Sequence, residues 1–187
     1  MTTCATAPLI MVDAITGWTW SWGIWNPINS NTPTSIMVVF NKPLDLDTVQ
    51  ITDFAVASPY KLITDMVVHT EVNCGVEWQG WTFVFLTVSP IMKTDEMPTV
   101  QLKAGQSVED ETGELILEGL VALVCQDGIA PIVGVTANPA EPGYNEMVTI
   151  TIQASEELSE AYFFVGEDSP QDYCWNTYKP ISCQIAP

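Results

Sequence analysis

The residues best suited to chemistry in this chain are carboxylates gathered at turns. Asp45 and Asp47 are spaced two apart after a Lys-Pro turn. A later acidic turn and a linker supply four more carboxylates: Glu109, Asp110, Glu111 and Asp127. Hard oxygen ligands at turns suit calcium, so the sequence predicts a calcium site drawn from this set. The alternative is a set of solvated turns, which Asp commonly forms, and the spacing of an EF-hand loop is absent.

Catalytic chemistry has no comparable set of residues. The one histidine, His69, has no second histidine beside it, and no G-x-S-x-G nucleophile elbow occurs. Glycine-rich phosphate-binding motifs are also absent. Carboxylate pairs are abundant by count alone, so they do not indicate glycoside hydrolysis. The sequence therefore predicts that the protein is not an enzyme.

Tryptophans form the second notable group. Trp18, Trp20 and Trp22 alternate with other residues, so on a strand they would share one face, and Trp25 follows closely. Such a row serves as the edge of a core, as a contact with a partner, or as a platform for sugar rings. The packed arrangement is favoured. Together with Trp78, the row defines an alternative function, a carbohydrate-binding accessory module.

The five cysteines predict disulfides rather than a metal site. No C-x-x-C pair occurs, and one histidine cannot complete a Cys/His zinc site. Cys174 and Cys183 bracket a short loop that one bridge could close, and Cys74 and Cys125 could link two strands, which would leave Cys4 over. The alternative is that all five thiols are reduced and buried.

The charge composition excludes several kinds of partner. The net charge is −18, with five lysines and no arginine. Nucleic acids and anionic membranes both attract cationic surfaces, so neither is an expected partner. Residues 14–41 carry no formal charge, but Pro27 and Pro33 interrupt them, so no membrane span is predicted. The absence of a signal-peptide pattern fits a mature segment of an exported protein as well as a cytosolic one.

Short strands separated by turns account for most of the chain. Residues 34–56 predict a strand that is apolar on both faces, then a turn, then a strand with Phe54 and Val56 on one face. Residues 81–88 predict a central strand, and residues 99–103 predict an exposed one. Helix signals are nearly absent, so the sequence predicts an all-β sandwich.

Three segments carry a resemblance to a known family. IMVVFNKPLDLDTVQITDFAV is similar to the opening of bacterial and archaeal Ig-like domains of the S-layer and adhesin type. WTFVFLTVSP and DEMPTVQLKAGQSVEDETGE are similar to their late strands and acidic turn. DGIAPIVGVTANPAEPGYNEMVTITIQASEELSE resembles the linker and first strands of a following repeat.

This resemblance covers residues 34–165 and implies an Ig-like β-sandwich. It also implies a structural or adhesive protein at the cell surface, which assembles with copies of itself or with neighbouring repeats into an extracellular layer or filament. In such repeats, acidic residues at domain ends can share a calcium ion and stiffen the joint.

Three parts are predicted along the chain. Residues 1–33 form an extended, Trp-rich segment, residues 34–127 form one complete sandwich, and residues 128–187 form a shorter second β unit after the Gly- and Pro-punctuated linker DGIAP. The shortage of strands in the second unit has three explanations. The chain is a piece of a longer protein, or the tail forms a disulfide-closed cap, or a neighbouring chain donates a strand from residues 8–25.

Overall fold

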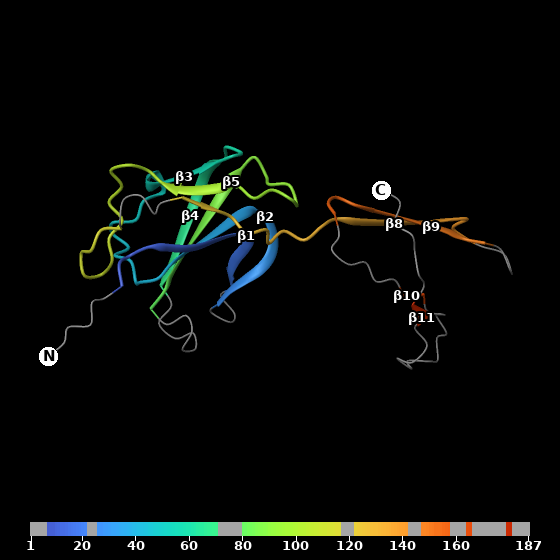
Figure 1. Cartoon of the computed structure of the whole chain (residues 1–187), viewed down its shortest axis with the longest axis horizontal. Coiled ribbons are helices and arrows are strands. Elements are labelled where there is room, and N and C mark those ends of the chain that lie inside the picture. Colours follow the sequence, from blue (N-terminus) through green and yellow to red (C-terminus); the bar gives the residue numbers. More distant parts are fainter. Residues whose placement is uncertain are drawn as a thin grey trace. The chain divides into compact units, whose positions relative to one another are not determined.

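The computed structural model describes residues 7–21, 26–70, 80–116, 122–141, 147–157, 164–165 and 179–180. The chain divides into two compact units, Met1–Ile132 and Val133–Pro187 (Figure 1). The first unit contains β1 (Met11–Ser21), β2 (Asn26–Phe40), the 3-10 turn η1 (Ile51–Asp53), β3 (Phe54–Ala57), β4 (Leu62–Thr70), β5 (Thr82–Ser89), β6 (Thr99–Leu102) and β7 (Ala122–Val124). The second contains β8 (Val133–Asn138), β9 (Thr149–Ala154), β10 (Phe164–Val165) and β11 (Lys179–Pro180).

The strands described in the first unit form two antiparallel sheets. One sheet has the order β1-β2-β5-β4, and the other has the order β3-β6-β7. One hydrophobic core contains residues from both sheets, as in two packed layers. The all-β prediction is confirmed, and this unit is sandwich-like.

Alternating residues of the paired strands supply that core. Successive side chains on a strand point to opposite faces, so each strand contributes every second residue. Across the two layers, the rings of Phe40 and Phe54 meet edge to face at 6.4 Å. The fully buried contributors, none more than 4% exposed, are Ile36, Val38, Phe40, Val84, Leu86, Val88, Phe54, Val56, Val100 and Leu102.

Two predictions about single strands had different outcomes. The strand predicted as central is β5, which lies between β2 and β4, so that prediction is confirmed. The strand predicted as exposed is β6, and here the prediction is wrong, because β6 lies between β3 and β7. Val100 and Leu102 are buried in the core, while Thr99 and Gln101 between them are half-buried.

The strand registers define two poles of the first unit. Met11, Phe40 and Thr82 lie together at the pole where residues 7–10 lead into β1, called here the N-terminal pole. Leu62 pairs with Ser89, and Thr99 pairs with Val124, at the opposite pole, called the C-terminal pole. The chain therefore enters this unit at one pole and leaves it at the other.

The hairpin of β1 and β2 bends sharply at Gly17. Thr16 pairs with Ile36, but Trp18 already pairs with Asn29, so β2 carries the extra residues of a wide bulge. A bulge of this kind bends the strands and increases their twist. Gly17 has a φ of +76°, which favours glycine. The hairpin beyond the bend, residues 17–21 and 26–32, is called the flap.

Residues 125–130, called the exit segment, run parallel to β1. Gln126 N donates to Ala14 O at 2.8 Å, and Thr16 N donates to Gln126 O at 3.0 Å. Gly128 N donates to Thr16 Oγ1 at 2.9 Å. The sequence placed residues 1–33 in a separate segment and began the second unit at 128. In the structure, β1, the candidate donated strand, pairs within its own chain, and the second unit begins at Val133.

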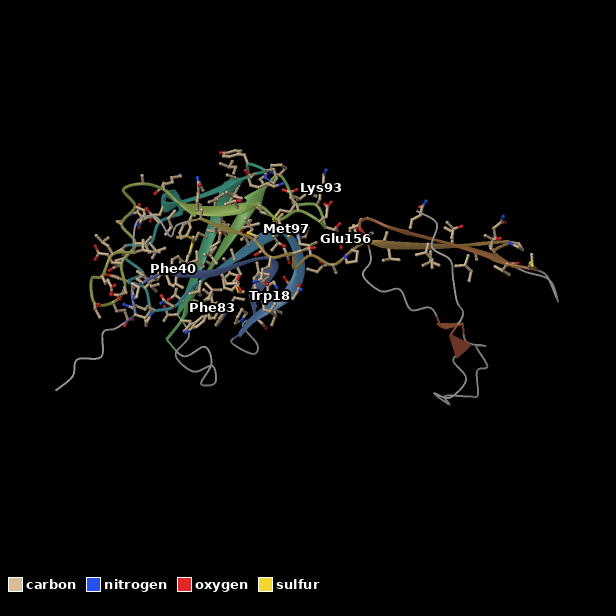
Figure 2. All side chains as sticks on the ribbon, viewed as in Figure 1. Trp18, Phe40, Phe83, Lys93, Met97 and Glu156 are labelled. Carbon is tan, nitrogen blue, oxygen red and sulfur yellow. The ribbon has the colours of Figure 1, made fainter. Side chains whose placement is uncertain are left out.

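The described residues of the second unit form two separate two-stranded sheets, β8-β9 and β10-β11. β8 and β9 pair in continuous antiparallel register from Val133 opposite Ala154 to Asn138 opposite Thr149. Side chains project from both sides of the β8-β9 ribbon (Figure 2).

Candidate functional site

Three of the predicted calcium ligands border one hollow at the N-terminal pole. Asp45, Asp47 and Glu111 line an open hollow of about 400 Å³, together with Leu44 and Leu46. Leu44 N donates to Thr82 Oγ1 at 3.0 Å, which fixes this loop to the end of β5. Asp45 Oδ1 accepts a hydrogen bond from Asp47 N at 3.1 Å, so one of these carboxylates also closes its own turn.

Asp110, in contrast, is buried, and its carboxylate already accepts hydrogen bonds from residues of the acidic turn. Its Oδ1 accepts hydrogen bonds from Thr112 Oγ1 at 2.6 Å and Glu114 N at 3.0 Å. Its Oδ2 lies 3.1 Å from Lys42 Nζ. Burial works to raise the pKa of Asp110, but these hydrogen bonds outweigh it and hold the pKa far below its usual range. Asp110 therefore stabilises the turn and is not open to a cation.

Lys42, just after the end of β2, connects that strand to the acidic turn. Its Nζ donates to both Asp110 and Glu114. The hydrogen bond with Glu114 is the largest influence on the pKa of Lys42, which is raised above its ordinary value. Lys42 thus neutralises part of the charge of the acidic turn, beside the carboxylates that line the hollow.

The two remaining predicted ligands have different surroundings. Glu109 contributes its backbone, since its carbonyl accepts Asp45 N at 2.9 Å and so ties the two loops together. Asp127 lies in the exit segment, where its Oδ1 accepts Ile129 N at 3.0 Å. Among the described residues, no three Asp, Glu, His or Cys side chains converge closely enough to hold a metal ion. Asp45, Asp47 and Glu111 share the hollow without converging that closely, so calcium binding there stays a prediction.

A second apolar cluster lies on the outer face of the four-stranded sheet. Met37 and Val39 of β2 and Phe83 and Phe85 of β5 point away from the core, yet all four are buried. The side chains that cover them include Trp18 and Trp20 of the flap, as well as Val12, Ile15 and Trp81. Trp18 and Phe83 are labelled in Figure 2. The flap therefore adds a third layer to the first unit.

The flap carries Trp20 across the outer face of the sheet as far as β4. Its ring stacks on His69 with a centroid distance of 4.3 Å and an interplanar angle of 15°. The rings of Phe83 and Phe85 each lie 6.3 Å from it. β1 and β4 are opposite edges of this sheet, so the flap lies across β2 and β5 where Trp20 meets His69. One face of Trp20 is thus occupied within the chain.

The other tryptophans and most cysteines in the predicted sites lie outside the described residues: Trp22, Trp25, Trp78, Cys4, Cys74, Cys174 and Cys183. Cys125 is described, and it is a free thiol in the core. Burial raises the pKa of Cys125 to about 12, and the charge of Asp13 acts in the same direction. Cys125 is therefore the packed, unreactive kind of cysteine.

Sequence reasoning missed a buried ion pair at the C-terminal pole. Lys61 Nζ lies 2.5 Å from Glu96 Oε1, and the two side chains are only 5% and 11% exposed. Burial works to raise the pKa of Glu96, but hydrogen bonds from Lys61 and from the backbone of Lys93 outweigh it and lower the pKa. The partners are far apart in sequence, so no local pattern could have indicated the pair.

Comparison with known proteins adds no relative. No protein-family model, curated protein or solved structure matches this chain. In the described part of the chain, no helix is both long and apolar enough to cross a membrane.

Proposed function

We propose that this chain is a structural or adhesive module of the Ig-like β-sandwich type, which acts at the cell surface by associating with copies of itself. The proposal includes no catalytic role.

The strand order of the first unit carries this proposal. The constant-type Ig sandwich has strands A, B, E and D in one sheet and C, F and G in the other. When β1 to β7 are lettered A to G in chain order, the sheets β1-β2-β5-β4 and β3-β6-β7 become A-B-E-D and C-F-G. The agreement involves every strand described in the unit, which supports the family resemblance in the sequence.

The positions of the two poles support an assembling role. A unit that the chain enters at one pole and leaves at the other suits modules strung end to end, because neither connection must double back.

The described residues offer less to the alternative, a carbohydrate-binding module. A sugar platform needs an open aromatic face, but Trp20 is stacked on His69, and Trp18 packs on the outer-face cluster. That alternative would depend on Trp22, Trp25 and Trp78.

Electron microscopy and light scattering of the purified full chain test the proposal. We expect ordered polymers or a rise of mass with concentration, without any added ligand. A monodisperse monomer at every concentration, with and without calcium, would reject self-assembly. Glycan-array binding that is lost in Trp22→Ala, Trp25→Ala or Trp78→Ala would instead favour the carbohydrate-binding alternative.

A further inference from the structure

Both strands of the β1-β2 hairpin leave regular extended backbone at the base of the flap. Gly17 on β1 has a φ of +76°, and Asn31 on β2 has a φ of +53°. Beyond this bend the two flap strands pair with each other, and the described pairing of β2 with β5 begins only at Ser35. A two-stranded ribbon is marginally stable by itself. Contacts of its side chains and contacts at its base therefore hold the flap on the sheet.

The exit segment contacts both residues of the bend. A Cβ atom at Gly17 would lie 2.6 Å from Gly128 O and 3.2 Å from Ile129 Cγ1, so the exit segment lies directly against this residue. On the other strand, Asn31 Oδ1 accepts a hydrogen bond from Ala130 N at 2.6 Å. Asn31 and Ala130 are 99 positions apart in the chain. A distant segment therefore holds the bend on both strands.

The exit segment also lies against a tryptophan of the flap. A Cβ atom at Gly128 would lie 3.0 Å from Trp18 Cδ1, so the indole of Trp18 packs on the Gly128 backbone. Trp18 is one of the side chains that cover the outer-face cluster. The neighbouring Ile129 is only 5% exposed and belongs to the main core. The exit segment is therefore anchored in the core while it touches the flap.

We propose that the exit segment acts as a strap that keeps the flap closed. When residues 128–130 leave the bend, the flap swings away from β2 and β5 about Gly17 and Asn31. Opening exposes the outer-face cluster and leaves the main core packed, because the two clusters are separate. The chain leaves the first unit at Ile132, so a displacement of this connection acts on the flap. This device is independent of the proposed function.

Two buried methionines distinguish opening of the flap from unfolding of the unit. Met37 belongs to the outer-face cluster and is 2% exposed, whereas Met11 belongs to the main core and is 4% exposed. Peroxide converts an accessible methionine to its sulfoxide. Opening of the flap oxidises Met37 alone, and unfolding of the unit oxidises both. Met147, which is 90% exposed, gives the rate of an open side chain. Peptide mass spectrometry of the full chain measures all three rates.

Substitutions at Asn31 test the contact with the exit segment. Asn31→Gly removes the acceptor of Ala130 N, and glycine adopts a positive φ without strain. Asn31→Asp is the matched control, because it keeps the acceptor oxygen. We expect Asn31→Gly to oxidise Met37 about fivefold faster than the wild type, the factor that follows from the loss of one hydrogen bond. Met11 should keep its wild-type rate, and Asn31→Asp should oxidise Met37 no faster than the wild type.

The coupling must also act in the opposite direction, because coupling between two sites is reciprocal. Trp20→Ala weakens the packing of the flap on Phe83 and Phe85. Amide hydrogen exchange at Gly128 and Ala130 should then accelerate more than exchange in β6, which reports loss of stability of the whole unit. Equal acceleration at these positions would show that the flap and the exit segment are not coupled.

Two oxidation results would overturn the inference. If Met37 and Met11 oxidise in step in the wild type and in both Asn31 variants, the flap opens only when the whole unit unfolds. If Asn31→Gly and Asn31→Asp give equal rates for Met37, the exit segment does not hold the flap. Neither result bears on self-association, which is measured separately.

Discussion

Gly128 determines how closely the exit segment approaches β1. A Cβ atom at this position would lie 2.1 Å from Thr16 O, and one at Gly17 would lie 2.6 Å from Gly128 O. These contacts are to backbone atoms, so neither can be relieved by a rotamer change. Two glycines far apart in sequence therefore meet at the bend of the hairpin.

Gly128→Ala should destabilise the first unit by at least about 2 kcal/mol, because the backbone segments must separate and their hydrogen bonds lengthen. Gly105→Ala is the control. It has a φ of +76° but no atom within 4 Å of its added Cβ, so its cost is only about 1 kcal/mol of backbone strain. Urea denaturation measures both, and an equal loss in the two variants would contradict the close approach.

The lowered pKa values of Asp110 and Glu96 make the first unit less stable in acid. The unfolded groups titrate near their ordinary values of 3.8 and 4.5, while the folded groups titrate lower. Their contribution is therefore complete above roughly pH 5.5 and is lost as the pH falls through the acid range. We expect melting temperatures to be flat near neutrality and to fall below that point.

Asp110→Asn should weaken this acid dependence, because the substituted side chain cannot titrate. The matched control is Asp95→Asn at an exposed turn, which should leave the profile unchanged. An Asp110→Asn profile as steep as that of the wild type would show that the hydrogen bonds and the ion pair of the Asp110 carboxylate contribute nothing to it.

At the scale of elements, the flap explains why the outer face of the four-stranded sheet is apolar. The sequence indicated that residues 34–40 are apolar on both faces, and the structure agrees. The reason for the outer apolar face, however, is the flap, which lies across β2 and β5. Periodicity predicts which residues share a strand face. It does not predict a bulge that moves the partner of β1 from Ile36 to Asn29, so the contact of Trp20 with His69 could not be foreseen.

Trp20→Ala should lower the free energy of unfolding by roughly 3 kcal/mol, because it leaves a cavity over Phe83 and Phe85. Tyr60→Ala, a truncation at a side chain that is 73% exposed, should change it by less than ~0.5 kcal/mol. Trp20→Phe should cost less than Trp20→Ala, since Trp20 Nε1 is buried without an acceptor in the described structure. Equal stabilities of Trp20→Ala and Tyr60→Ala, measured by thermal denaturation, would exclude the flap as a packed layer.

The loops at the N-terminal pole test the calcium prediction. If Asp45, Asp47 and Glu111 bind the ion, calcium at tenfold excess over its dissociation constant should stabilise the first unit by about 1.4 kcal/mol. Asp45→Asn with Glu111→Gln should remove the shift in melting temperature, and Asp127→Asn should not. An identical melting temperature in calcium and in chelator would reject the site.

At the scale of the whole molecule, the sequence predicted the class of fold better than the assignment of segments to units. Strand content and turn spacing were enough for an all-β sandwich. The boundary near residue 130 was visible from Gly and Pro. The membership of β1 was not, because its pairing with the exit segment joins Thr16 to Gln126, 110 positions further along the chain, and pairing across so great a separation leaves no periodic signal. For the same reason, the sequence did not show that Asp127 lies in the exit segment, apart from the carboxylates that line the hollow.

The parallel pairing of β1 with the exit segment has a mechanical consequence. Tension applied to residues 7 and 132 would pull these two segments in opposite directions along their length. The hydrogen bonds of Ala14, Thr16, Gln126 and Gly128 would then bear the load in shear, all together, rather than peel one at a time. We expect a high unfolding force in single-molecule pulling between these points, and a lower one for Thr16→Val, which loses the bond to Gly128. A module held in this way resists stretching between its two poles.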